Sequence, residues 1–173
     1  MSRLPDPDTV SMTAEERATF DARGAGGPSS VWRWVPAIAE PANALVLQMR
    51  NGSLDRRLYR VMCLVVARTW TCEHVFRLHK RAALEEGVAA DVIEAIRTRR
   101  VPPFTREDER ITYELTTELL TTRELQLTTH DRAREAFGLE HTIELVTGIG
   151  VYSTICGMLK AFDVAPEGER ELL

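Results

Sequence analysis

Four residues with chemically versatile side chains lie within the stretch TCEHVFRLH, residues 71–79. They are one cysteine, one glutamate and two histidines, at Cys72, Glu73, His74 and His79. A thiol near the start of a helix can become a nucleophile, because the unpaired backbone N–H groups there lower its pKa. An imidazole titrates near neutral pH and can act as a general acid or base. This stretch is therefore the first candidate for a reactive site.

The spacing of apolar residues predicts that a helix starts here, with Thr71 as its N-cap and Cys72 in its first turn. At about 100° per residue, Cys72 and His79 fall on the apolar face and Glu73 on the opposite face, where a surface charge is expected. His74 lies at the boundary. The predicted helix therefore turns the thiol and one imidazole toward the interior.

The spacing of Cys72 and His79 separates them by roughly 10 Å along a helix axis, so they cannot form a direct hydrogen bond. One turn before His79, the position for a direct partner is Val75, which neither donates nor accepts. A histidine on an apolar helix face is often a core residue bonded to a carbonyl group. The residues alone therefore leave both a reactive and a structural interpretation open for Cys72 and His79.

The composition fits one soluble globular domain. A chain of 173 residues is long enough for a single hydrophobic core. The net charge of −4 and the pI near 5.6 argue against nucleic acid or an anionic membrane as the main partner. The opening MSRLPDPDTVSM has no apolar run typical of a secretion signal, and no 18 apolar residues follow one another. We expect a cytoplasmic protein that binds neither nucleic acid nor membranes.

Three cysteines, Cys63, Cys72 and Cys156, form no C-x-x-C motif and no zinc pattern. We expect reduced thiols, with Cys63 and Cys156 as buried filling of the core. His141 and Glu144 lie three residues apart on one predicted helix and could share a metal ion, but two ligands make no site. No metal and no cofactor is therefore expected.

Proline, glycine and the apolar periodicity divide the chain. Residues 1–30 read as an N-terminal arm with one short helix, which a capping box from Thr13 starts. Residues 32–49 have helical spacing that Pro36 and Pro41 are expected to interrupt.

The rest of the sequence predicts further helices and no sheet, because no segment alternates between apolar and polar residues. We expect Ser53 and Thr105 to be N-caps and Gly87 and Gly138 to end helices. The fold class is an all-α, single-domain bundle of seven or eight helices over residues 31–165, followed by a tail at 166–173. The helix expected over 139–162 is apolar around much of its circumference, so it is either the central core helix or part of a subunit interface.

The stretch LDRRLYRVMCLVVARTWTCEHVFRLHKRAALEEGVAADVIEAI, residues 54–96, resembles the core of the carboxymuconolactone decarboxylase family, which includes the alkylhydroperoxidase D-like proteins. The resemblance depends on an L-x-x-R start, a histidine eight residues before a glycine, and the EEGV…DVIEAI continuation. FTREDERITYELTTELL and HTIELVTGIGVYSTICGMLKAFDV resemble the closing helices of that family. The resemblance implies an all-α homo-oligomer, a dimer, trimer or hexamer, with a small-molecule site in a pocket that neighbouring subunits help to close.

In the peroxidase-like members the signature is a C-x-x-C motif, then three residues and a histidine, with a glutamate twelve positions upstream. Cys72 matches the first cysteine, His79 the histidine, and His74 a histidine that some members carry between the cysteines. Val75 replaces the second cysteine and Arg60 the glutamate. The resemblance therefore implies that a C-x-x-C disulfide cannot form here.

Three hypotheses follow from the resemblance. The first is a cofactor-independent enzyme in which His79 is the general acid or base, with Cys72 and His74 beside it. Arg60 would bind a substrate carboxylate and Glu144 would line the pocket, which suits decarboxylation or lactone chemistry. The second is a peroxidase or thiol sensor that depends on Cys72. The third is a non-enzymatic scaffold or regulatory protein whose pocket has lost its proton relay.

Overall fold

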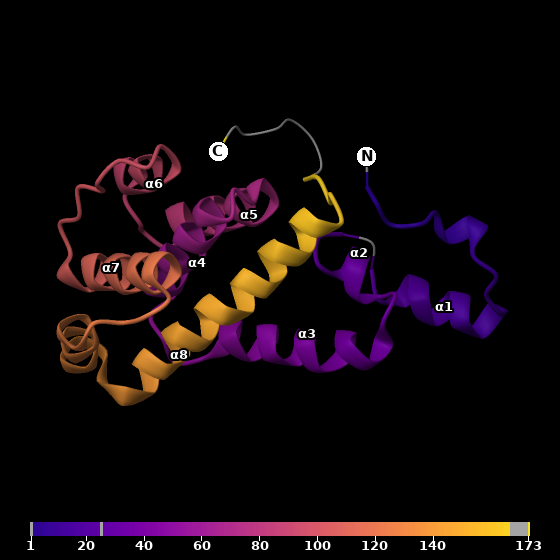
Figure 1. Cartoon of the computed structure of the whole chain (residues 1–173), viewed down its shortest axis with the longest axis horizontal. Coiled ribbons are helices and arrows are strands. Elements are labelled where there is room, and N and C mark those ends of the chain that lie inside the picture. Colours follow the sequence, from indigo (N-terminus) through magenta and orange to yellow (C-terminus); the bar gives the residue numbers. More distant parts are fainter. Residues whose placement is uncertain (1, 25, 167–172) are drawn as a thin grey trace.

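The computed structural model describes residues 2–24, 26–166 and 173, and within these the chain is all-α with no strand. Most of the tail expected at 166–173, residues 167–172, lies outside the described residues. The predicted fold class is confirmed (Figure 1). The elements are a short 3-10 turn η1 (Pro7–Thr9) and the helices α1 (Ala14–Ala22), α2 (Ser29–Trp32), α3 (Pro36–Asn51), α4 (Arg56–Thr69), α5 (Glu73–Glu85), α6 (Ala90–Arg97), α7 (Glu107–Thr122) and α8 (Leu127–Ala161).

Helix α4 is the centre of the molecule. It contacts α5, α6, α7 and α8, and every residue from 58 to 67 is buried. A helix that is buried around its whole circumference needs neighbours on all sides. Figure 1 shows α8 crossing in front of α4, with α5, α6 and α7 on the other sides. Tyr59, Arg60 and Cys63 are therefore held inside the protein.

The end of α4 and the start of α5 share one tight turn. The N–H of Cys72 donates to the carbonyl of Ala67 at 2.8 Å, and the N–H of Thr71 donates to the carbonyl of Arg68 at 3.1 Å. This is the Schellman pattern of a helix C-terminus, with Thr71 in the left-handed region at a φ of 48°. The N-cap of α5 is therefore Cys72 and not Thr71, because the turn that ends α4 already uses Thr71.

Three other predicted boundaries are wrong. Asp55, not Ser53, is the N-cap of α4, because its carboxylate accepts from the N–H of Arg57 at 2.9 Å. Helix α7 starts after Arg106, one residue later than a cap at Thr105 would place it. Helix α3 continues through Pro41, whose ring is on the exposed side of the helix, where loss of one backbone hydrogen bond is tolerated.

Helix α8 has a kink at Gly138, where φ is 76° and ψ is 175°. These angles suit glycine, and they separate the helix into the two parts that the sequence predicts. By length and composition α8 could cross a membrane, since its most apolar window has a mean hydropathy of 1.4. Of that window, 44% is buried against the rest of the protein. This test is weak evidence for a membrane span.

The N-terminal arm contains the predicted short helix. Thr13 and Glu16 form the capping box at the start of α1. The Phe20 ring packs against Trp34, with ring centres 4.6 Å apart, and the guanidinium of Arg33 lies over the same ring. These contacts hold the arm to the start of α3.

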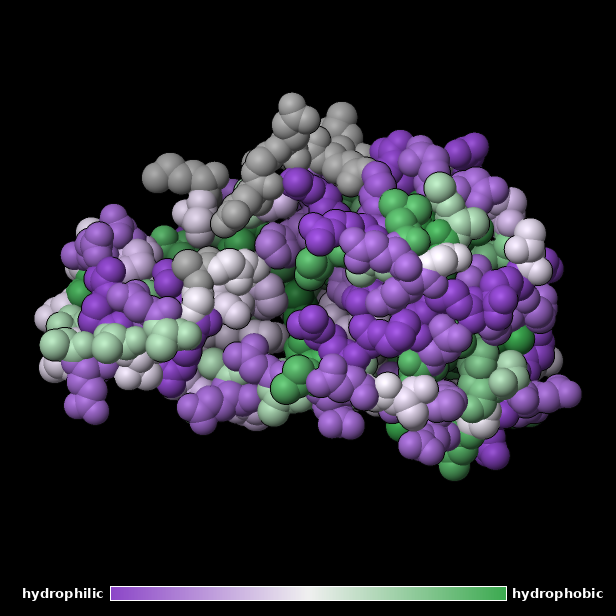
Figure 2. Space-filling view, turned by 180° about the vertical axis from the view of Figure 1, so that it is seen from behind, coloured by the Kyte–Doolittle hydropathy of each residue, from purple (hydrophilic) through white to green (hydrophobic). Residues whose placement is uncertain are grey.

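Apolar side chains are exposed on two neighbouring helices, α3 and the second part of α8. They include Ile38, Leu47, Leu139 and Ile143. Seen from behind, the surface far from the N-terminal elements is mainly hydrophilic, with smaller apolar groups (Figure 2). The homo-oligomer stays a prediction.

The left-handed turn at Thr71 should make glycine preferable there. We expect Thr71→Gly to raise the free energy of unfolding by about 0.5–1 kcal/mol, because a β-branched residue is strained at this φ. The matched control is Thr69→Gly, at the last residue of α4, which should lower it by about 0.3 kcal/mol because glycine has a poorer helix propensity than threonine. Urea denaturation measures both. Equal destabilisation by the two substitutions would contradict the turn.

Candidate functional site

His79 lies in a buried polar cluster that also contains Arg60. Its Nδ1 atom is 3.1 Å from Nη1 of Arg60, and the two side chains come from neighbouring helices, α5 and α4. A guanidinium can only donate, so Nδ1 of His79 must accept and the ring hydrogen lies on Nε2. His79 is only 2% exposed. Both the position and the tautomer of this ring are therefore determined by Arg60.

Arg60 already binds a carboxylate of the protein itself. Its Nε and Nη2 atoms lie 2.9 and 3.0 Å from the two carboxylate oxygens of Glu86, the C-cap residue of α5. Arg56 lies 3.7 Å from the same carboxylate. A two-point contact of this kind is the strong geometry between arginine and a carboxylate. The guanidinium of Arg60, which we expected to bind a substrate carboxylate, is therefore already bound to Glu86.

Two tyrosines complete the shell around His79. The hydroxyls of Tyr59 and Tyr152 are hydrogen-bonded to each other, and their ring centres lie 5.8 and 5.0 Å from the imidazole. Burial raises the pKa of Cys63, whose thiol bonds to both tyrosines. Burial, and then the positive charge of Arg60, lower the pKa of His79 to about 3. His79 is therefore neutral at physiological pH.

Cys72 lies in different surroundings. It is 2% exposed and forms the wall of a cavity of about 110 Å³ between the start of α5 and the end of α8. His74 and Lys160 also line this cavity. The thiol is thus at the helix start, with a basic side chain beside it. The space is large enough for a few water-sized atoms.

The pKa of the Cys72 thiol is lowered to about 7. The largest cause is a hydrogen bond from the Cys156 thiol, which acts against burial; the N–H groups of Val75 and His74 and the charge of Lys160 lower it further. The hydrogen bond donated to Cys72, together with burial, raises the pKa of Cys156. In this pair Cys72 is the thiolate and Cys156 stays protonated.

Residues 36–108 match the model of the Carboxymuconolactone decarboxylase family. Over these residues, which make up less than half of the chain, the protein is similar to the carboxymuconolactone decarboxylase family. The match includes Cys72, His79, Arg60 and Glu86, and Cys156 lies outside it. No curated protein matches the chain.

A solved structure with the same fold is a protein of unknown function from Agrobacterium tumefaciens, for which a role as the antioxidant defence protein AhpD has been suggested. The two chains superpose with a TM-score of 0.72 and 17% sequence identity, over 80% of this chain and 97% of the other. At this identity the likeness establishes the alkylhydroperoxidase D-like fold. The sequence match and the structural likeness thus cover the same all-α fold.

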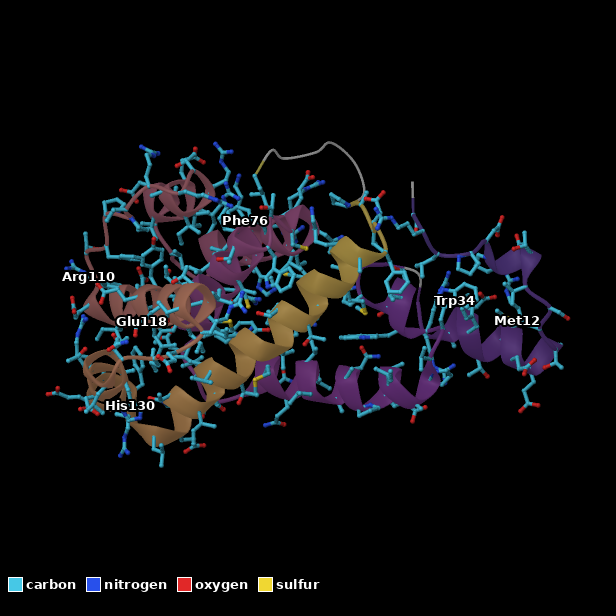
Figure 3. The ribbon with its side chains drawn as sticks, in the orientation of Figure 1. Met12, Trp34, Phe76, Arg110, Glu118 and His130 are labelled. Atoms are coloured by element: carbon cyan, nitrogen blue, oxygen red, sulfur yellow. The ribbon has the colours of Figure 1, made fainter. Side chains whose placement is uncertain are left out.

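The other residues predicted for a site lie elsewhere. Glu144 accepts from the N–H of Leu54 at 3.1 Å, and Nε2 of His141 lies 3.0 Å from Oγ of Ser53. Both side chains hold the loop between α3 and α4. The remaining histidine, His130, which was not predicted for a site, bonds to its neighbour Asp131 near the start of α8 and away from α5 (Figure 3). Among the described residues, no group of three or more His, Cys, Asp and Glu side chains could hold a metal ion.

His74 lies between two cavities. It lines both the cavity at Cys72 and a larger groove of about 1140 Å³ between α5 and the N-terminal arm. A Cβ at position 27 would lie 2.6 Å from Nε2 of His74, so only glycine allows this close approach. Cys156 and Glu86 are partners of the site that the spacing of residues in the sequence does not reveal. For Glu86 the available signal was its place at the end of the helix that starts at Cys72.

A single thiol should titrate near neutral pH. We expect one thiolate with a pKa of about 7, since the pKa values of Cys63 and Cys156 are raised. Absorbance at the thiolate band between pH 5 and 9 measures it. Cys72→Ser should remove the step and Cys63→Ala should keep it, whereas a step that survives in Cys72→Ser would assign it to another thiol.

His79 should make the protein less stable in mild acid. Its folded pKa of about 3 is below the unfolded value of about 6.5, so the unfolded chain binds a proton in this range that the folded chain does not. Stability should therefore fall as the pH drops from 6.5 toward 3, by up to about 1.4 kcal/mol per unit from this group. His79→Gln should flatten the dependence of Tm on pH relative to the wild type. Identical slopes in the two proteins would contradict the neutral buried ring.

Proposed function

We propose that this protein reduces small hydroperoxides with Cys72 as the attacking nucleophile. The observation that supports the proposal most is the position of Cys72 at the start of α5, on the wall of a cavity, with a pKa of about 7. The thiolate is the reactive form of cysteine, and a pKa near ambient pH combines a large thiolate fraction with good nucleophilicity. Cys72 is therefore suited to attack a peroxide.

The reaction needs only the thiolate and the peroxide. The Cys72 sulfur attacks one oxygen of the O–O bond, an S–O bond forms, and the O–O bond breaks. The second oxygen leaves with its electron pair and takes a proton from solvent, which yields an alcohol or water and a sulfenic acid on Cys72. Lys160 lines the same cavity, so its positive charge can stabilise the leaving oxygen.

The dimensions of the cavity suggest the class of substrate. A volume of about 110 Å³ suits hydrogen peroxide or a short alkyl hydroperoxide better than a long lipid chain. The antioxidant role suggested for the Agrobacterium tumefaciens protein is of the same chemical class, although only the fold is shared with it.

The geometry gives less support to acid–base catalysis at His79. Nδ1 of the ring accepts from Arg60, and the pKa of His79 is about 3. Glu86 occupies the guanidinium that would bind a substrate carboxylate. His79 and Arg60 therefore have the contacts of a buried structural cluster, and the cavity at Cys72 favours the thiol hypothesis over that of a scaffold.

Peroxide consumption tests the proposal. We expect the wild type to consume hydrogen peroxide or tert-butyl hydroperoxide with dithiothreitol as reductant, and to give a dimedone adduct at Cys72 after a short exposure. Cys72→Ser should abolish both, because no other thiol has a lowered pKa.

Two variants serve as controls for this assay. Cys63→Ala removes a buried thiol outside the cavity and should leave peroxide consumption intact. His79→Gln should also keep it where the folded state is retained, which separates the thiol mechanism from acid–base chemistry. Consumption by Cys72→Ser at the wild-type rate would refute the proposed function.

A further inference from the structure

We propose that Cys156 is the second thiol of the reaction cycle and that it closes a disulfide with Cys72 between α8 and the start of α5. The oxidation of Cys72 in this cycle rests on the proposed function. Cys156 lies 84 positions after Cys72 and outside the C-x-x-C spacing, where Val75 stands in the second position.

Packing between the α4–α5 turn and α8 brings the two thiols together. The Trp70 ring covers Gly157 so closely that a Cβ at that position would lie 3.3 Å from it. Trp70 is two residues before Cys72, and Gly157 directly follows Cys156. Leu159, one turn further along α8, lines the cavity with Cys72. The contact between Trp70 and Gly157 joins two segments that are far apart in the sequence. It shows that the segments lie together without any use of a pKa.

The turn holds Cys72 in place on this surface. Its N–H bonds to Ala67 at 2.8 Å, and Thr71 before it has a left-handed φ of 48°. Cys72 and Cys156 are both buried and both reduced, and a side-chain hydrogen bond from Cys156 is the largest cause of the lowered pKa of Cys72. A disulfide needs Cα atoms about 4.4–6.8 Å apart, and the packing of Trp70 on Gly157 brings the two chain segments together.

The two thiols have complementary roles. Cys156 donates its hydrogen to the thiolate of Cys72, which keeps Cys156 protonated and unreactive while Cys72 is reduced. After the peroxide converts Cys72 to a neutral sulfenic acid, that negative charge is gone. Cys156 is then able to lose its proton. The arrangement therefore sets the order of the steps, with Cys72 first and Cys156 second.

The second step balances without a further oxidant. The Cys156 sulfur attacks the Cys72 sulfur, the S–S bond forms, and the S–O bond of the sulfenic acid breaks. The hydroxide that leaves takes the Cys156 proton and becomes water. Two thiols have then lost the two electrons that the peroxide gained. An external dithiol returns the pair to the reduced state by thiol–disulfide exchange.

Cys63 is the alternative partner and is engaged elsewhere. Its thiol bonds to the hydroxyls of Tyr59 and Tyr152 inside the polar cluster of His79. Neither Cys63 nor Cys156 lines the cavity at Cys72, but only Cys156 forms a hydrogen bond with the Cys72 thiol. Cys63→Ala is therefore the matched control for Cys156→Ser.

Peptide mapping of the full chain tests the inference. Trypsin places the three cysteines on separate peptides, Cys72 on 69–77, Cys156 on 135–160 and Cys63 on 61–68. After one equivalent of hydrogen peroxide, we expect the wild type and Cys63→Ala to give peptide 69–77 linked to 135–160, with the loss of two hydrogens. Cys156→Ser should instead keep the sulfenic acid, with close to one dimedone adduct per chain on 69–77. Diamide, which oxidises thiols without a peroxide, should give the same link in the wild type.

The outcomes separate the two proposals. A sulfenic acid on Cys72 of the wild type without the link to 135–160, or a link to 61–68, would overturn the role of Cys156 and leave the proposed function standing. A link with diamide but no oxidation of Cys72 by peroxide would overturn the proposed function and the second step with it. If Cys156→Ser does not fold, as judged by circular dichroism, the mapping of the wild type alone still decides the matter.

Discussion

The complete burial of α4 is the constraint on which the rest of this structure depends. Residues 58 to 67 are all buried, and one of them is Arg60. A buried charge is costly unless it is paired and hydrogen-bonded. Glu86 supplies the charge partner from the end of α5, and His79, in the middle of the same helix, accepts a further N–H. The packing of α5 on α4 therefore depends on the ion pair between Arg60 and Glu86.

The polar groups near α5 lie in two places with opposite effects on charge, one at His79 and one at Cys72. At His79, burial and a neighbouring cation favour the neutral ring and lower its pKa to about 3. At Cys72, a donated hydrogen bond and the helix start favour the charged thiolate and bring its pKa to about 7. The two groups lie on one face of α5, and the thiol borders the cavity of about 110 Å³. This contrast is the reason why we propose the start of the helix, and not its middle, as the reactive position.

Local signals predicted the elements well where a few neighbouring residues decide them. The apolar pattern of α4 and α5, the capping box at Thr13 and the break at Gly138 all agree with the structure. The prediction was wrong at Pro41, because the exposed surface of α3 tolerates a missing hydrogen bond. The predicted N-cap of α5 was one residue too early, because Thr71 belongs to the turn that ends α4 and Cys72 is the N-cap. Such boundaries depend on how two helices meet, which the periodicity of either helix does not contain.

The amino-acid sequence by itself determined the fold class, the family resemblance and the fact that Cys72 and His79 share the buried face of one helix. These depend on periodicity and on spacings of a few residues, which a sequence shows directly. Only the tertiary structure shows that Glu86 binds the guanidinium of Arg60 and that the Cys156 thiol forms a hydrogen bond with Cys72. A pKa depends on charges and hydrogen bonds within a few ångströms, and those come from residues distant along the chain. The pKa values of the thiol and the imidazole therefore depend on groups that the folded chain brings to the two ends of the Cys72–His79 face.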